Sequence, residues 1–341
     1  MEIQWSLVLF TALTGMGGCM FACVAADEFL GRAKAAAFPA AVAALAIAVV
    51  GGLASVTHLS HPDRIMGALS HPTSGIFTEA LLVGCLCVCV AVYLVLVKRE
   101  AGAGARKAVA VIGAVFGLLL SFMAGESYLM EARPNWCSQL LPLGYLLTAV
   151  PEGIAAYLVV VAAKAKGADV APYGRALLVG GMLAAVGAAA YVLWAGPADG
   201  VQWALLVVAV LGAGVVPAAC GALLGKKPES LMAMAGGSLA CAFVGAVSYR
   251  CIMWLITVPI ANLFLNVLSA QGRGRGIPFP GRLAMNSRFV FASPHLPPFL
   301  RRMRTASASS VATGRVRDAA NENRYSALAH GLPVRAGRQW T

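Results

Sequence analysis

The sequence predicts an all-α polytopic membrane protein, a bundle of eight transmembrane helices followed by a basic tail. Of its 341 residues, 60% are hydrophobic and 12% are charged, whereas a soluble globular domain carries roughly 25% charged residues. So little charge cannot cover the surface of a soluble protein of this size. The composition therefore excludes an ordinary cytosolic enzyme, a disordered chain and a small disulfide-linked scaffold.

Eight apolar runs predict the helices. A hydrocarbon core of about 30 Å requires roughly 20 apolar residues per helix. The runs that meet this length cover residues 4–26, 38–58, 75–97, 108–130, 140–163, 173–195, 201–223 and 231–255. The first run is preceded by no basic residues and is too long for a signal peptide, so we expect it to be a span. Small residues, as in GMGG at 15–18, permit close approach of helices in lipid.

The charges between the runs predict the orientation, because Lys and Arg accumulate on the cytoplasmic side. The first, third, fifth and seventh connections contain ten Lys and Arg residues, whereas the second, fourth and sixth contain two, Arg64 and Arg133. We therefore expect the odd-numbered connections in the cytoplasm and both ends of the bundle outside. The protein is expected to be a multi-pass protein of the inner (cytoplasmic) membrane.

The last part of the chain differs from the rest in charge. Residues 268–341 contain 12 Arg, no Lys and two acidic residues, whereas residues 1–267 contain 14 Lys and Arg and 12 Asp and Glu. We divide the chain into an eight-helix anchor domain, 1–267, and an Arg-rich tail, 268–341, which is expected to be disordered. An altered reading frame or binding to an anionic membrane surface would each account for the excess of Arg.

Ionisable residues in the spans are candidate functional residues, because charge is costly in lipid. The predicted topology places His58, Glu79, Glu126 and Arg250 near the outer face. Such a set suits quinol oxidation, in which a flat ring from the bilayer loses two protons and two electrons. His58 would accept a proton, and Glu79 or Glu126 would relay it. Arg250 would polarise a ring oxygen or pair with a glutamate, and a purely structural role remains open for each residue.

Glu152 stands apart from this set. It follows Pro151 near the middle of the fifth run, where proline can kink a helix. A broken helix at the membrane midplane is typical of secondary transporters, which gives an alternative function. A hydrogen bond between helices is the structural interpretation of Glu152. A further alternative is a purely structural anchor, with quinone handled elsewhere.

The chain is not expected to hold an electron carrier of its own. A haem inside the membrane usually requires two histidines on facing helices, and of the five His only His58 lies at a run. Cys85, Cys87 and Cys89 fall within one run and do not suit an iron–sulfur centre. A quinol-oxidising chain of this kind would therefore pass its electrons to a partner subunit.

Three segments and one arginine carry a resemblance to a known family. Residues 52–64, GLASVTHLSHPDR, are similar to the family stretch GxxASxxHLGxPxR, with Ser60 where the family often has Gly. Residues 74–79, SGIFTE, contain the Ser and acidic residue that follow, and residues 134–138, PNWCS, are similar to its PxWxS element. With Arg250 in the last run, the sequence over about 1–260 resembles the DmsC-type anchor subunits of anaerobic dimethyl sulfoxide reductase complexes.

This resemblance implies a haem-free anchor that oxidises menaquinol in anaerobic respiration. It implies two partners, an iron–sulfur subunit with four clusters and a molybdopterin catalytic subunit, to which the electrons pass, and it implies no nucleic acid. His58 matches the quinol-site histidine of the family. The candidate catalytic residues are thus His58, Glu79 and Glu126. The candidate quinol-binding residues are His58, Arg64, Trp136 and Arg250.

Overall fold

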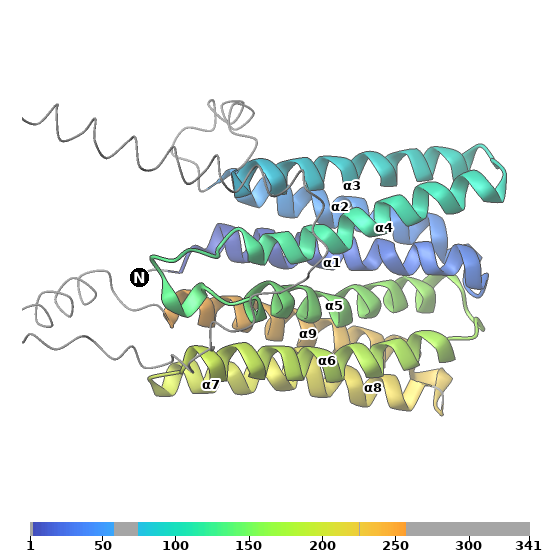
Figure 1. Cartoon of the computed structure of the whole chain (residues 1–341). Coiled ribbons are helices and arrows are strands. Elements are labelled where there is room, and N and C mark those ends of the chain that lie inside the picture. The colour runs from blue at the N-terminus through green and yellow to red at the C-terminus, as the bar shows by residue number, and fades with distance from the viewer. Residues whose placement is uncertain (1–2, 58–73, 225, 257–341) are drawn as a thin grey trace, which may run out of the picture. The chain divides into compact units, whose positions relative to one another are not determined.

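The computed structural model describes residues 3–57, 74–224 and 226–256, and every long element in these ranges is a helix (Figure 1). His58 and Arg64, two of the candidate site residues, lie outside the described residues, as does the whole tail. The long elements are α1 (Trp5–Leu30), α2 (Lys34–Val56), α3 (Gly75–Lys98), α4 (Ala103–Glu126), α5 (Leu140–Lys164), α6 (Ala171–Ala195), α7 (Gly200–Ala209), the π-helical η3 (Val210–Val215), α8 (Val216–Leu224) and α9 (Leu231–Leu255).

Eight of these segments are long and apolar enough to cross a membrane, which confirms the predicted number of spans. The seventh span, Gly200–Leu224, consists of α7, η3 and α8. A π-helical turn contains one extra residue and often marks a site of unusual packing. Here it faces α9 closely, because a Cβ atom on Gly245 would lie 2.2 Å from the backbone nitrogen of Ala213. The sequence did not reveal this irregularity.

The helix ends differ from the predicted runs by four or five residues in α1, which ends at Leu30, in α2 and in α4. α2 begins at Lys34 rather than residue 38, because the Asp27 carboxylate accepts hydrogen bonds from the backbone N–H groups of Arg32 and Ala33 at 3.0–3.2 Å and fixes the connection just before it. α4 covers Ala103–Glu126 rather than 108–130. Arg106 therefore lies in the first turn of α4 and not in the connection. Its Nε lies 3.7 Å from Glu28 Oε2.

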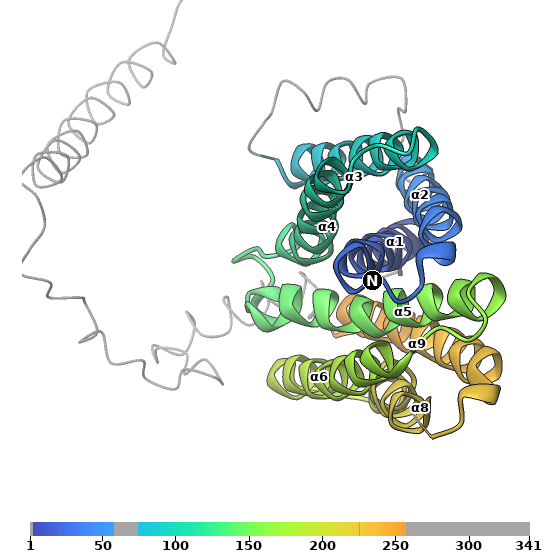
Figure 2. The same ribbon diagram turned by 90° about the vertical axis from the view of Figure 1, so that its right-hand side faces the viewer.

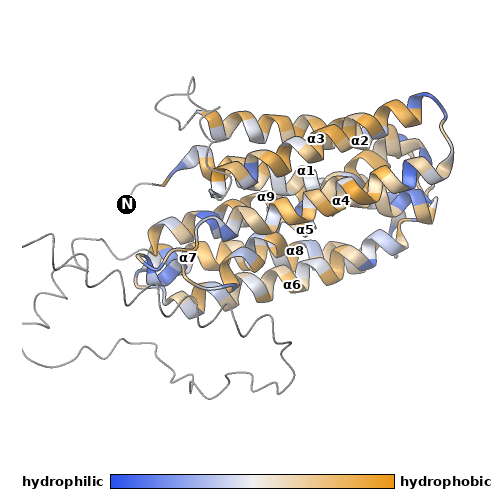
Figure 3. Ribbon diagram, turned by 45° about the horizontal axis from the view of Figure 1, so that its top comes forward, coloured by the Kyte–Doolittle hydropathy of each residue, from blue (hydrophilic) through white to orange (hydrophobic). Residues whose placement is uncertain are grey.

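Successive spans run in opposite directions, so each end of the bundle gathers alternate connections (Figure 1). We call the end where α1 begins the Trp5 end and the opposite end the Lys98 end. Figure 3 shows that hydrophilic residues gather near the ends of the helices and that the middle is mostly hydrophobic. The ten basic residues that the sequence assigned to the odd-numbered connections all lie at the Lys98 end, in the connections or in the adjoining helix ends: Arg32, Lys34, Lys98, Arg99, Arg106, Lys107, Lys164, Lys166, Lys226 and Lys227.

α1 and α5 form the centre of the bundle, and α1 packs against α2, α4 and α5 (Figure 2). Of the most apolar stretch of α1, 72% of the residues are buried, whereas the corresponding value for α3 is 17%. α3 therefore lies at the periphery and exposes large apolar side chains such as Ile76, Leu81 and Val88. Glycine permits the close contacts of α1, because a Cβ atom on Gly18 would lie 2.8 Å from both the Cα and the carbonyl oxygen of Gly117 on α4.

We predict that Gly18→Ala destabilises the protein, because the added methyl group meets backbone atoms that cannot move aside. The expected loss is about 1–3 kcal/mol, typical of overpacking. Gly84→Ala is the matched control, since a Cβ atom there meets nothing within 4 Å. Thermal unfolding in detergent should give a lower Tm for the first variant alone, and equal Tm values would contradict the proposed α1–α4 contact.

We also predict that the Lys98 end faces the cytoplasm. The native Cys137 is exposed in the α4–α5 connection at the Trp5 end, and Gly102 lies in the α3–α4 connection at the Lys98 end. A membrane-impermeant maleimide added to intact cells should label Cys137, and should label a Gly102→Cys variant at the new site only after permeabilisation. The reverse pattern would invert the predicted orientation.

Candidate functional site

The four described candidate residues lie at the Trp5 end of the bundle. Glu79 is in the second turn of α3, and Glu126 is the last residue of α4. Trp136 ends the short 3-10 helix η2 (Pro134–Trp136) in the α4–α5 connection, and Arg250 lies just over one turn before the end of α9. Residues from four separate elements thus reach the same end of the bundle.

Glu79 is held against the end of α4. The Ser127 hydroxyl, directly after α4, donates a hydrogen bond to Glu79 Oε1. The first residues of α3 explain why the two helices meet here. The Ser74 side chain caps α3 by accepting a hydrogen bond from the backbone N–H of Phe77 at 3.2 Å, which fixes where the helix begins. Gly75 then allows close approach, because a Cβ atom there would lie 2.6 Å from Ser127 Cβ. Glu79 is half-buried, so its carboxyl group is largely removed from water.

Trp136 anchors the α4–α5 connection to α9. Its indole Nε1 donates a hydrogen bond to the carbonyl oxygen of Met253 at 2.8 Å, and the side chain is buried. Its ring meets Tyr128 and Trp254 edge to face, at centroid distances of 5.8 and 5.4 Å. The Arg133 guanidinium lies 4.2 Å from the ring centroid. Because the N–H group is already bonded within the protein, Trp136 has no free donor for a ligand.

Arg250 is fully buried and is held by α1, α5 and α9. Its Nε donates to Thr11 Oγ1 at 3.0 Å and its Nη2 to the Thr11 carbonyl at 3.2 Å. Its Nη1 donates to the carbonyl oxygen of Ala246 at 2.9 Å and to Thr148 Oγ1 at 3.4 Å. The guanidinium carbon lies 4.7 Å from the ring centroid of Tyr145. The positive charge is thus compensated by neutral oxygens and an aromatic face.

Of the two roles considered for Arg250, pairing with a glutamate of this end is not found among the described residues. Neither Glu79 nor Glu126 forms an ion pair with it there. Glu126 instead accepts a hydrogen bond from Gln139 Nε2 at 3.3 Å through Oε1. Its Oε2 is buried and has no hydrogen-bond partner within the described part of the chain.

Aromatic residues connect Glu79 with Arg250, and sequence reasoning missed them. Tyr128 interacts electrostatically with Glu79, and its ring centroid lies 6.0 Å from that of Tyr145, which lies under the guanidinium. Burial raises the pKa of the Tyr128 phenol well above its usual range, so this residue stays protonated. In the sequence these tyrosines are indistinguishable from core aromatic residues, because only the helix rotation shows which way they point.

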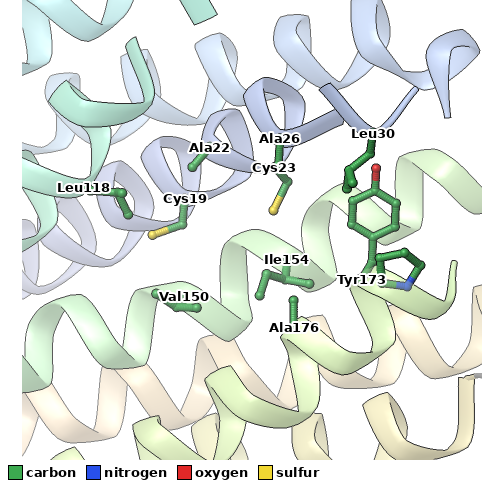
Figure 4. Close-up of a pocket in the computed structure, with 11 residues that line it drawn as sticks. Cys19, Ala22, Cys23, Ala26, Leu30, Leu118, Val150, Ile154, Tyr173 and Ala176 are labelled. Carbon is green, nitrogen blue, oxygen red and sulfur yellow. The ribbon is translucent and has the colours of Figure 1, made fainter. Parts of the chain in front are cut away.

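The structure contains a cavity of about 240 Å³ away from these residues (Figure 4). It lies between α1, α5 and α6, with Leu118 of α4 beside it, toward the Lys98 half of the bundle. Cys19, Cys23 and Tyr173 are its polarisable lining groups, and the rest of the lining is apolar. The Tyr173 hydroxyl donates a hydrogen bond to the Asp27 carboxylate at that end. None of the four described candidate residues lines this cavity.

Two further observations bear on cofactors and on the transporter alternative. Within the described ranges, no cluster of three or more His, Cys, Asp and Glu residues could hold a metal ion. α5 continues as one helix from Leu140 to Lys164 through Pro151, so the interruption typical of a transporter site is not found in this helix.

Eight apolar helices that gather ionisable and aromatic residues at one end define a multi-pass membrane protein with a candidate site at the membrane surface. Comparison with protein families makes the assignment more specific. Residues 1–194 match the model of the DMSO reductase anchor subunit family (DmsC), and the chain belongs to this family. A comparison with curated proteins gave no match. The matched range includes Glu79, Glu126 and Trp136 but ends before Arg250.

We predict that Trp136→Phe lowers stability, because it removes the hydrogen bond to the Met253 carbonyl and leaves that buried oxygen without its side-chain donor. The expected loss is about 1–3 kcal/mol. Trp203→Phe is the control, because Trp203 is 48% exposed. Thermal unfolding should separate the two variants, and a loss of equal size in both would show that the hydrogen bond contributes nothing.

Proposed function

We propose that this chain is the menaquinol-oxidising membrane anchor of a molybdopterin oxidoreductase complex of the dimethyl sulfoxide reductase type. Membership of the DmsC family supports the anchoring role and the association with reductase subunits. The catalytic part of this proposal rests on the position of Glu79. Its side chain is half-buried at one end of the bundle and accepts a hydrogen bond from Ser127. A carboxyl group so placed can accept a proton where an apolar ring enters from lipid.

The proposed reaction releases two protons and two electrons from quinol. His58, which matches the quinol-site histidine of the family, and Glu79 take the protons, and the Ser127 hydroxyl stabilises the Glu79 carboxylate that is ready to accept one. Glu126, with one carboxyl oxygen without a hydrogen bond in the described residues, is the second candidate for the relay.

The remaining candidate residues bind and orient the ring. Arg64 would hold a ring oxygen, and Trp136 would position the α4–α5 connection beside the quinol, because its buried indole is bonded to the Met253 carbonyl. Arg250 acts through its charge, since its buried side chain donates to Thr11, Thr148 and Ala246. The electrons pass to an iron–sulfur partner subunit and from there to a molybdopterin subunit.

The proposal has a consequence for energy conservation. If the Trp5 end and the catalytic partner both lie outside the membrane, the protons from quinol are released on the side where the terminal reduction consumes protons. The overall reaction would then be electroneutral. Proton release measured in vesicles tests this point, and net charge movement across the membrane would overturn it.

We predict that Glu79→Gln in the purified complex lowers quinol-dependent turnover about 100-fold, the lower range for loss of a general acid or base. The partner subunits should still co-purify, and turnover with a soluble dye donor that reduces the partners directly should not change. Glu131→Gln is the matched control, because Glu131 is an exposed acid at the same end of the bundle.

The same assay with His58→Ala tests the second proton acceptor. Unchanged quinol turnover in both Glu79→Gln and His58→Ala, with intact assembly, would contradict the site and favour a purely structural anchor. A loss of dye-dependent turnover as well would indicate a failure of assembly instead.

A further inference from the structure

The cavity between α1, α5 and α6 takes no part in the proposed quinol chemistry, and it has the form of a groove along α1. The lining residues of α1 are Cys19, Ala22, Cys23, Ala26 and Leu30. Steps of three, four, seven and eleven residues from the first place them on one face of the helix. Between Cys19 and Leu30 an α-helix rises about 16 Å. This length is about half of the hydrocarbon core of a bilayer.

The groove extends from the middle of the bundle to the Lys98 end (Figure 4). One end is formed by Cys19, Leu118 and Val150, which lie in the middle parts of their helices. The other end is formed by Leu30, the last residue of α1, and by Tyr173 in the first turn of α6. The groove therefore covers the depth of one lipid leaflet.

The groove is open on the surface of the bundle. Four of its lining residues are exposed: Ala26, Leu30, Leu118 and Ala176. These residues lie in helices that are long and apolar enough to cross a membrane, so their exposed side chains face lipid. The small side chains of Ala26 and Ala176 leave the space between the helices unfilled. A flexible apolar chain can therefore enter the groove sideways from the bilayer.

The acidic residues that flank the Lys98 end of the groove are all engaged within the protein. Asp27 accepts hydrogen bonds from the Tyr173 hydroxyl and from two backbone N–H groups of the α1–α2 connection. Asp169, just before α6, pairs with Arg32. Glu28 accepts a hydrogen bond at 2.7 Å from a tyrosine of α3. Their negative charges are thus directed to partners in the protein.

Two basic residues at the same end carry positive charge that no acid compensates. Arg175 directly precedes the lining residue Ala176 and is exposed. The side chain of Lys34 lies over the end of α1, because its Cε would lie 3.4 Å from a Cβ atom on Gly31, which follows Leu30. Within the described ranges, neither side chain forms a hydrogen bond or an ion pair. A groove that is apolar along its length and positive at its end matches a lipid with an anionic headgroup.

We propose that this groove binds one acyl chain of an anionic glycerophospholipid, whose phosphate lies beside Arg175 and Lys34. The chain fills the hollow that the small side chains leave and adds the van der Waals contacts that an empty groove lacks. The predicted orientation places this end in the cytoplasm, and basic sites between helices on that side suit anionic headgroups. The inference goes beyond the proposed function, because lipid binding at the Lys98 end requires no quinol turnover at the Trp5 end.

Native mass spectrometry of the purified complex tests the headgroup site. The complex is mixed in detergent with phosphatidylglycerol or with phosphatidylcholine of the same acyl chains, and the wild type should retain the first lipid more tightly. Arg175→Gln should weaken the retention of phosphatidylglycerol about fivefold, the contribution of one basic residue near an anionic surface. Arg99→Gln is the matched control, because Arg99 is exposed at the same end, directly after the peripheral helix α3, and lines no part of the groove.

Equal retention of the two lipids by the wild type, or an equal loss in the two variants, would overturn the proposed headgroup site. Displacement of the bound lipid by menaquinone but not by added phosphatidylglycerol would identify a quinone as the occupant and would also overturn it.

A second pair of variants tests the position of the acyl chain. Ala26→Trp fills the groove and should abolish the retention of phosphatidylglycerol, whereas Ala91→Trp, at an exposed position of α3, should not change it. Co-purification of the partner subunits shows that each variant is folded. In the wild type, phosphatidylglycerol with a photoreactive group in its acyl chain should attach to the peptide that contains residues 19–30. Retention by Ala26→Trp, or attachment to α3 alone, would show that the chain lies elsewhere and would overturn the proposal.

Discussion

The buried guanidinium of Arg250 determines how the Trp5 end is built. A charge inside a membrane protein is tolerated only where oxygens and aromatic faces replace water. Thr11 on α1, Thr148 on α5 and the Ala246 carbonyl on α9 supply those oxygens, and Tyr145 supplies the ring. One side chain thereby fixes the relative rotation of three helices, because turning any of them would leave the charge without its acceptors.

The rest of the Trp5 end follows from this fixed rotation. Tyr145 lies beneath the cation and contacts Tyr128, which is packed against Trp136. Trp136 in turn binds the backbone of α9 near its end. Glu79 on the peripheral helix α3 reaches the same group through Ser127, directly after α4. The candidate site is therefore assembled from the central helices outward.

Hydropathy was sufficient to predict the eight spans, because a bilayer requires long apolar helices and leaves few alternatives. The same topology correctly placed Glu79 and Arg250 at one end of the bundle. The partners of Arg250 were not predictable, since Thr11 and Thr148 are recognised as acceptors only when the rotation of each helix is known. The alternative in which Arg250 pairs with a glutamate is not found among the described residues, because charge alone does not show which side chains face each other.

The peripheral position of α3 determines how a molecule dissolved in the bilayer would meet the site. Only 17% of the most apolar stretch of α3 is buried, and Ile76 and Leu81, on either side of Glu79 in the sequence, are more than half exposed, at 54% and 52%. The hydrocarbon chains of lipids therefore contact the helix that carries this carboxyl group. A hydrophobic substrate can approach Glu79 sideways, by diffusion within the leaflet, without passing through the interior of the bundle or entering water.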